Sequence, residues 1–323
     1  MKLSRRHALL AAAAMALPAW AQDYPARTIT LVVPFTAGGG VDAVARLLAD
    51  RLRVSLKQSV VVDNKPGASG MLGAAAVAKA QGDGYTLLLG SAGETAINPL
   101  VYKARMQYQP GKDFAPITLV ARVPNVLVTS TSFPAKNVAE LVSYAKAHPG
   151  KVGYATSGVG NPQHLNGELL ASVAGIQLNH VPYKGAANQL VDVASGVVEL
   201  AFVSYAGAAP FIKGGRVKVL AVTSAQRASF APDIPAIAET AATASYSLEN
   251  WFGLFAPAAT PPAIQARLNA AVVEALKDPE LAKRLREQGG EPAPMTQQQF
   301  RDFIAKETQK YAQIVEAAHI TPE

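Results

Sequence analysis

The stretch "TITLVVPFTAGGGVDAVARLLADRL" (residues 28–52) indicates the fold class, because it joins a predicted strand to a predicted helix through a glycine-rich turn. Its apolar, β-branched start at about residues 28–33 is typical of a buried strand. The periodic apolar residues from about 41 to 52 predict a helix. A strand, a tight turn and a helix in this order form the first unit of an α/β domain.

The same turn contains a dinucleotide-binding pattern. Gly38, Gly40 and Ala43 spell G-x-G-x-x-A, and Asp63 lies 23 residues beyond Gly40, where such motifs place an acid that binds ribose. An NAD(P)-dependent oxidoreductase is therefore the alternative function that the sequence raises.

Two features of this turn disfavour a dinucleotide. Residues 34–37 separate the strand from the glycines, whereas the motif needs its first glycine directly after the strand. Asp42 lies in the first turn of the predicted helix, where its carboxylate would repel a pyrophosphate but can cap free N–H groups. The positive end of the helix dipole still suits one small anion such as a carboxylate.

The N-terminal segment "MKLSRRHALLAAAAMALPAWAQ" (1–22) predicts export, which also disfavours a cytoplasmic cofactor. It has a basic start, an apolar run from Ala8 to Leu17 and the small-residue pattern Ala19-Trp20-Ala21. This is the pattern of a secretory signal peptide, and we expect cleavage after Ala21 following Sec or Tat export. The apolar run is shorter than the roughly 20 residues of a membrane span.

Composition excludes several classes of function. The formal charge is +7, of which the signal peptide supplies three cations, and the remaining Lys and Arg are scattered without a basic run. This distribution does not favour nucleic-acid binding. There is no cysteine, the five histidines show no metal-ligand spacing, and "LGSAG" (89–93) has Leu89 where a nucleophile elbow requires glycine. We therefore expect no metal, no cofactor and no catalytic residue.

Two proline-marked segments indicate where the chain passes between domains. Pro124 interrupts the long apolar run "ITLVARVPNVLVTS" (117–130), and "LENWFGLFAPAATPP" (248–262) could carry the return crossing. We predict a signal peptide at 1–21, a discontinuous lobe of 22–122 and 248–323, and a second lobe of 123–247. Each lobe is expected to be an α/β unit with a mainly parallel sheet, and the cleft between them is the expected ligand site.

Further loops carry candidate ligand contacts. The segment "YATSGVGNPQHLNGE" (154–168) again runs from strand to helix, and it offers hydroxyl, amide and N–H donors from Thr156, Ser157, Gly158 and Asn161. His164 falls in the first helical turn, as either a structural capping residue or a ligand contact. In "LGSAGETAINP" (89–99), Ser91 and Ala92 follow a strand, where α/β sheets present ligand contacts.

Local signals predict several helix starts and core faces. Asn137 with Glu140 predicts an N-cap, and Thr296 with Gln299 predicts a capping box. The apolar stripes of the last two long helices are expected to face the core: Ile264, Leu268, Val272 and Leu276 in one, and Phe300, Phe303, Ile304, Tyr311 and Ile314 in the other.

Many ordered segments resemble one family. They include "YPARTITLVVPFTAGGGVDAVARLLADRL", "VVVDNKPGASGMLGAAAVAKAQGDGYTLLLG", "KDFAPITLV", "HPGKVGYATSGVGNPQHLNGELL", "HVPYKGAANQLVDVASGVVELAF", "VLAVTSAQR" and "NWFGLFAPAATP". Together they cover nearly all of the mature chain. The chain thus resembles the solute receptors of tripartite tricarboxylate transporters, the Bug family.

The resemblance implies a monomeric periplasmic-binding-protein fold of the Venus flytrap, type II-like kind. Such a receptor captures a small organic carboxylate by hinge closure and delivers it to a membrane permease, with no chemical step. Val203 stands where many relatives have an acidic residue, which favours a ligand without an ammonium group. The expected ligand-binding residues are Phe35, Thr36, Ala37, Gly38, Gly39, Asp42, Ser91, Ala92, Thr156, Ser157, Gly158, Asn161, His164 and Ser204.

Overall fold

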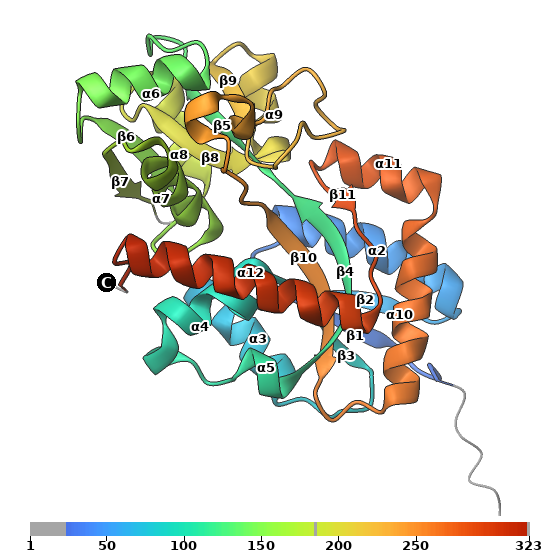
Figure 1. The fold of residues 1–323 in the computed structure, drawn as a ribbon. Helices are drawn as coiled ribbons and strands as arrows, with labels where there is room; N and C mark the ends of the chain where they lie inside the picture. Colours follow the sequence, from blue (N-terminus) through green and yellow to red (C-terminus); the bar gives the residue numbers. More distant parts are fainter. Residues whose placement is uncertain (1–23, 184–185, 322–323) are drawn as a thin grey trace, which may run out of the picture.

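The computed structural model describes residues 24–183 and 186–321, and it has two α/β lobes (Figure 1). The predicted signal peptide and its cleavage site lie outside the described residues. Among those residues, no helix combines the length and the hydrophobicity that crossing a membrane requires.

Lobe 1 is built on a six-stranded sheet of order β11-β4-β10-β3-β1-β2. Its strands are β1 (Ile29–Val33), β2 (Val60–Asn64), β3 (Thr86–Ser91), β4 (Phe114–Val123), β10 (Asn250–Pro257) and β11 (Glu291–Pro292). Its α-helices are α2 (Gly40–Leu56), α3 (Met71–Ala78), α4 (Asn98–Val101), α5 (Pro110–Asp113), α10 (Pro262–Leu276), α11 (Pro279–Glu287) and α12 (Gln297–Ala317). The predicted helix 41–52 is thus the first part of a longer helix, α2.

Lobe 2 is built on a five-stranded sheet of order β7-β6-β8-β5-β9. Its strands are β5 (Asn125–Ser130), β6 (Val152–Thr156), β7 (Leu178–Pro182), β8 (Leu200–Ser204) and β9 (Val217–Val222). Its helices are α6 (Val138–Ala147), α7 (Pro162–Ala174), α8 (Ala186–Ser195) and α9 (Tyr205–Lys213).

The two-lobed α/β fold class is confirmed, but both sheets are mixed rather than mainly parallel. Strand β1 pairs in parallel with β2 and β3, and β6 with β7 and β8. Strand β10 is antiparallel to β3 and β4, and β5 is antiparallel to β8 and β9. These are the strands that bring the chain into each lobe. Strands β10 and β5 each lie between two other strands of their sheet. Each runs away from the other lobe and is therefore antiparallel to both of its neighbours.

Strand pairing at the crossings fixes which edges of the two sheets meet. Only Pro124 separates β4 from β5, and β10 begins the return into lobe 1 at Asn250. Ser91, at the end of β3, pairs with Phe252 near this start, and Asn125 pairs with Ser204, at the end of β8. Because β1 is parallel to β3 and β6 to β8, all four strands end at the edge that faces the other lobe.

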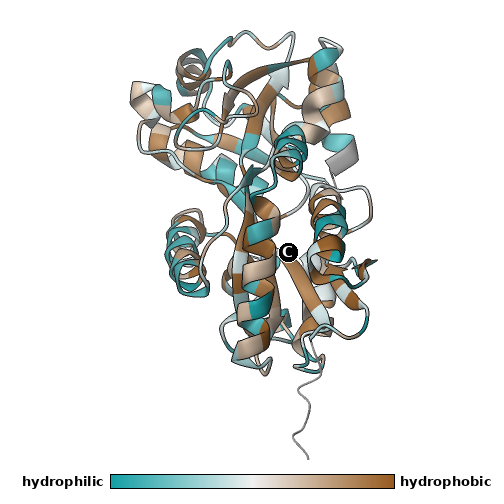
Figure 2. Cartoon of the chain, turned by 90° about the vertical axis from the view of Figure 1, so that its right-hand side faces the viewer, coloured by the Kyte–Doolittle hydropathy of each residue, from teal (hydrophilic) through white to brown (hydrophobic). Residues whose placement is uncertain are grey.

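Local sequence signals agree with the helices observed. Asn137 accepts a hydrogen bond from the Glu140 N–H at the start of α6, and Thr296 and Gln299 form the predicted capping box of α12. The apolar stripes pack inward as expected, with Leu268, Val272, Leu276, Phe300, Tyr311 and Ile314 buried. Figure 2 shows the resulting pattern, in which hydrophobic strands lie inside and the hydrophilic faces of the helices point outward.

Candidate functional site

Four loops face the gap between the lobes, one after each of β1, β3, β6 and β8. Ligands of α/β sheets bind outside the carboxyl ends of strands, so these loops form the candidate site. All of the predicted ligand-binding residues lie on these loops, at the strand ends that precede them, or in the first turn of the following helix. We name the loop after β1 (residues 34–39) the first loop and the loop after β6 (157–161) the second loop.

Asp42 organises the first loop from inside. Its side chain is buried, and its Oδ2 accepts hydrogen bonds from the Gly38 N–H and from Arg46 Nε, both at 2.9 Å. Asn64 Nδ2 donates to Asp42 Oδ1 at 3.0 Å and to the Phe35 carbonyl at 3.1 Å. Burial acts to raise the pKa of Asp42, but the hydrogen bonds from Arg46, Gly38 and Asn64 outweigh it and lower that pKa. Asp42 is therefore a fixed anion that holds the loop.

The outer side of the first loop presents hydrogen-bond donors. Thr36, Ala37, Gly38 and Gly40 are exposed, and Gly38 has a φ of 83° that favours glycine. Gly39 precedes α2 without a side-chain cap, so the N–H groups of the first turn remain available. Free N–H groups at the positive end of a helix dipole attract an anion.

Asn161 and Gln163 shape the second loop. The Asn161 side-chain carbonyl accepts the His164 N–H at 3.0 Å, and its Nδ2 donates to Ser157 Oγ at 3.1 Å. Gln163 Oε1 accepts the Ser157 N–H at 2.7 Å. Because Ser157 Oγ accepts from Asn161, its own proton remains free to donate. Ser157 and Gly158 are half-buried, so this donor can reach a ligand beside the loop.

His164 supports the second loop from below. It is buried, and its Nδ1 accepts the Gly160 N–H at 3.0 Å. Since Nδ1 accepts, the imidazole proton is on Nε2, which lies 3.6 Å from Glu168 Oε1. The ring also stacks on His180, with 3.7 Å between ring centroids. Of the two roles predicted for His164, this geometry matches the structural one.

His180 contacts Thr156 through a hydrogen bond that was not predicted from the sequence. Thr156 Oγ1 donates to the Gly158 carbonyl at 3.0 Å and lies 2.7 Å from His180 Nε2. Burial, with a smaller effect of His164, lowers the pKa of His180 to about 4, so the ring is neutral at pH 7. Thr156 is fully buried, and its hydroxyl is occupied within the loop.

Glu94, which was not predicted from the sequence, accepts a hydrogen bond from the hydroxyl of Ser91 at the end of β3. Ser91 Oγ donates to Glu94 Oε2 at 2.6 Å, and the Ser91 N–H donates to Oε1. Ser91 and Ala92 are both buried. Burial raises the pKa of Glu94 to about 7, against the hydrogen bonds from Ser91. After β8, Ser204 Oγ caps α9 by accepting the Gly207 N–H at 3.3 Å.

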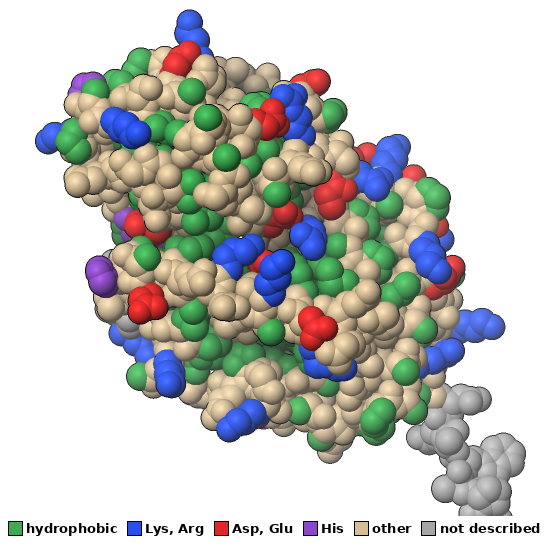
Figure 3. Space-filling view, in the orientation of Figure 1, with side chains coloured by type: hydrophobic (Ala, Val, Ile, Leu, Met, Phe, Trp, Pro, Cys, Tyr) green, Lys and Arg blue, Asp and Glu red, His purple; other side chains and the backbone are tan. Residues whose placement is uncertain are grey.

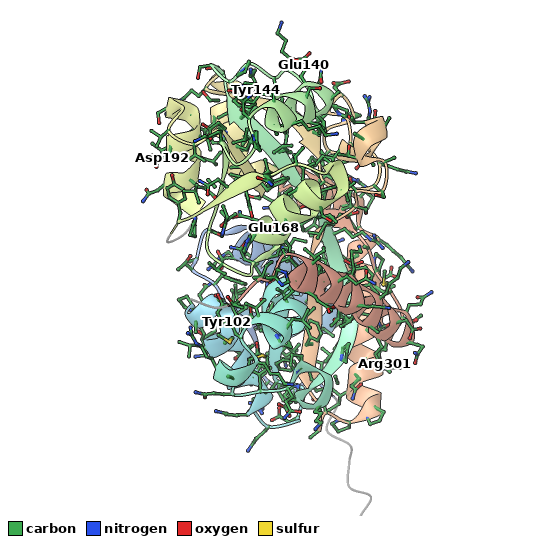
Figure 4. All side chains as sticks on the ribbon, turned by 60° about the vertical axis from the view of Figure 1, so that its left-hand side comes forward. Tyr102, Glu140, Tyr144, Glu168, Asp192 and Arg301 are labelled. Atoms are coloured by element: carbon green, nitrogen blue, oxygen red, sulfur yellow. The ribbon has the colours of Figure 1, made fainter. Side chains whose placement is uncertain are left out.

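Tyr102 links the second loop to lobe 1. This residue follows α4, and its hydroxyl donates to the Val159 carbonyl at 2.9 Å. Gly160 packs against Val101 so closely that a Cβ at Gly160 would lie 2.8 Å from a Val101 methyl. Figure 4 shows Tyr102 on lobe 1 below α7, with Glu168 on the side of lobe 2 that faces it.

The chemistry of the four loops is that of an anion-binding site. Within residues 24–183 and 186–321, no group of three or more His, Cys, Asp or Glu residues could hold a metal ion. What the first and second loops present are hydroxyl and N–H donors. Such donors can bind a carboxylate, and they include no activated nucleophile or general base.

Comparisons with known proteins agree on one family. The family described as "Tripartite tricarboxylate transporter family receptor" matches residues 44–320. Protein BugT of Bordetella pertussis is 37% identical over 306 residues, which cover 95% of this chain and 94% of BugT.

Three solved structures share the fold. The R. palustris protein Rpa4515 with adipate is 39% identical, with a TM-score of 0.84, and the match covers 93% of this chain and all of that chain. The periplasmic binding protein BugD is 33% identical, with a TM-score of 0.79 and the same coverage. MatC (Rpa3494) from Rhodopseudomonas palustris with bound malate is 31% identical, with a TM-score of 0.77, covering 90% of this chain and all of that chain.

Proposed function

The chain belongs to the tripartite tricarboxylate transporter receptor family, and we propose that it binds a small organic carboxylate in the cleft between its lobes. It then presents this acid to a membrane permease of the tripartite tricarboxylate type. We propose that it does so in the periplasm and as a monomer, with lobes of 22–122 plus 248–323 and 123–247.

Family membership decides against the oxidoreductase alternative, because the relatives are solute receptors rather than enzymes. The structure gives a physical reason for the misleading motif. Asp42 is buried beneath the G-x-G-x-x-A turn and ionised, where it would repel a pyrophosphate. Asp63, the expected ribose-binding acid, forms an ion pair with Lys65 at 3.0 Å.

The observation that carries the proposal is the pair of donor-rich loops, one on each lobe, at the sheet edges that face each other. The first loop would bind one carboxylate oxygen through N–H groups at the start of α2, and the Ser157 hydroxyl would bind from the second loop. Two relatives hold the dicarboxylates adipate and malate, which supports an acid of similar size.

Val203 supports an acid without an amino group. Its side chain is 2% exposed and packs in the core of lobe 2 with Val126 and Ala155, so this position offers no counter-ion for an ammonium group. We therefore propose that the ligand is a simple carboxylic or hydroxycarboxylic acid.

A thermal-shift screen of ligand-stripped mature protein tests this proposal, with adipate, malate, citrate and NAD as ligands. An acid at about 100 times its Kd should stabilise the fold by about 2.7 kcal/mol, a Tm increase of about 4 °C for a chain of this size. Ser157→Trp should abolish the shift. Ser59→Trp is the matched control, because exposed Ser59 precedes β2, at the opposite end of the sheet from the cleft.

Stabilisation by NAD and by none of the acids would overturn the proposal. An equal ligand-induced Tm increase in wild type and Ser157→Trp would still support a carboxylate receptor. It would reject the proposed role of the second loop in binding. Circular dichroism before ligand addition checks that both tryptophan variants are folded.

A further inference from the structure

Lobe 1 carries a large groove away from the cleft. Its volume is about 950 Å³, and it lies between α12 and the segments 95–116. In Figure 3 it is the hollow below α12, with hydrophobic side chains on its floor and Lys and Arg side chains at its edge. We name it the α12 groove. None of its lining residues belongs to the first or second loop.

The floor of the α12 groove is apolar. It is formed by the side chains of Ala96, Pro99, Met106, Tyr108, Phe114, Phe255 and Ile304. The one hydroxyl among them is satisfied internally, because Tyr108 donates to the Glu94 carbonyl at 2.6 Å. A ligand on this floor would therefore gain from burying apolar surface and would find no unpaired polar group there.

The rim of the α12 groove is positively charged. Lys103, Lys112 and Arg301 line it, and no acidic side chain does. Among the described residues, none of the three cations forms an ion pair. Arg301 Nη2 donates to the uncharged Gln298 Oε1 at 2.9 Å, and the two acids nearest in sequence bind uncharged donors: Asp113 Oδ2 accepts the Gln109 N–H at 2.6 Å, and Asp302 Oδ1 accepts from Gln298 Nε2 at 2.8 Å. Figure 4 places Arg301 on α12 well away from Glu168 and the cleft.

We propose that the α12 groove is a second binding site, for an amphipathic monocarboxylate with an unbranched alkyl chain of medium length. An apolar floor matches the chain, and cations at the rim match the carboxylate. The volume is at the upper end of the range for small-molecule pockets. This ligand differs from the proposed cleft ligand. The cleft presents hydrogen-bond donors from two sides and suits a small polar acid, whereas the α12 groove needs an alkyl chain to cover its apolar floor.

Calorimetric titration of octanoate tests the second site, with 1-octanol as the uncharged probe of the same length. Saturating the cleft with the acid found by the screen, or blocking it with Ser157→Trp, should leave octanoate affinity unchanged within about twofold. Failure of the cleft proposal would therefore not affect this result. Octanol should bind about tenfold more weakly than octanoate at low salt, which corresponds to one lost charge-assisted contact.

Variants locate the octanoate site. Ile304→Glu should abolish binding by placing a carboxylate on the floor, and Ala305→Trp should do so by filling the groove from an exposed lining position without burying a charge. The double change Lys103→Gln and Arg301→Gln should weaken binding about tenfold. Lys306→Gln is the control, since exposed Lys306 lies on α12 outside the groove.

Loss of binding in the groove variants and not in the control supports the proposal. Octanoate binding that survives both Ile304→Glu and Ala305→Trp would overturn it, as would no octanoate binding by wild type. Equal affinity for octanol would reject the role of the rim cations. Octanoate that competes with the cleft acid would reassign it to the cleft.

Discussion

Glu94→Gln should change how stability depends on pH. Glu94 is fully buried beneath the cleft, and its two oxygens accept the Ser91 hydroxyl and N–H. Burial raises its pKa from the ordinary 4.5 to about 7. Glutamine has the same shape but no charge to bury, so it removes the titration and keeps one acceptor for Ser91.

The sign and size of the effect follow from proton linkage. Between pH 4.5 and 7 the folded protein holds a proton at Glu94 that the unfolded chain has lost, so stability falls as the pH rises. The raised pKa corresponds to about 3 kcal/mol, all of it present below pH 4.5 and lost above pH 7. Asp42 and Glu168 have lowered pKa values and act in the opposite direction, but they are common to both proteins.

Urea unfolding at pH 4.5, 5.5, 6.5 and 8, followed by circular dichroism, measures the difference between wild type and variant. Glu94→Gln should gain about 3 kcal/mol relative to wild type between pH 4.5 and 8. Glu274→Gln, which removes an exposed carboxyl from α10, is the control. A difference that does not vary with pH, or that grows in favour of wild type, would show that Glu94 does not titrate with a raised pKa.

Three further substitutions test other parts of the structure. Asp42→Ala should remove the acceptor of the Gly38 N–H and the contacts that fix Arg46 and Asn64, lower the free energy of unfolding by about 1–3 kcal/mol and weaken acid binding at least tenfold; an unchanged midpoint in urea would contradict this. Tyr102→Phe should weaken acid binding about fivefold in calorimetry, because the bond to Val159 between lobes is worth about 1 kcal/mol; unaltered affinity would exclude a role for this contact. Gln189→Met should raise the Tm, since both polar side-chain atoms of Gln189 are buried without a partner among the described residues and each costs about 1–3 kcal/mol; a lower Tm would count against it.

The sequence predicted the elements and the positions of the loops well, because these depend on local signals. Asn137 and Thr296 mark helix starts through capping, and Pro124 stands between β4 and β5. The mixed sheet order was not predictable in the same way. The insertion of β10 between β3 and β4 depends on contacts between segments more than 100 residues apart.

The sequence could not show whether the hydroxyl of a loop residue is free for a ligand or is hydrogen-bonded within the protein. Ser91 and Thr156 are hydroxyl residues at strand ends, as a binding site requires, but their hydroxyls are held by Glu94 and His180. Ser91 and Glu94 have the S-x-x-E spacing of a capping box, a signal that could have indicated this pair, whereas no spacing in the sequence links Thr156 to His180. Asn64 was also missed, although Asp63 beside it was considered, because its contact with Asp42 exists only once β2 lies next to β1.

Whether both lobes bind the carboxylate can be seen in a crystal structure of the mature protein with the acid that gives the largest thermal shift. We expect one carboxylate group within about 3.2 Å of N–H groups at the start of α2 and of the Ser157 hydroxyl. A carboxylate bound by only one lobe, or bound in the α12 groove with the cleft free of ligand, would contradict this expectation.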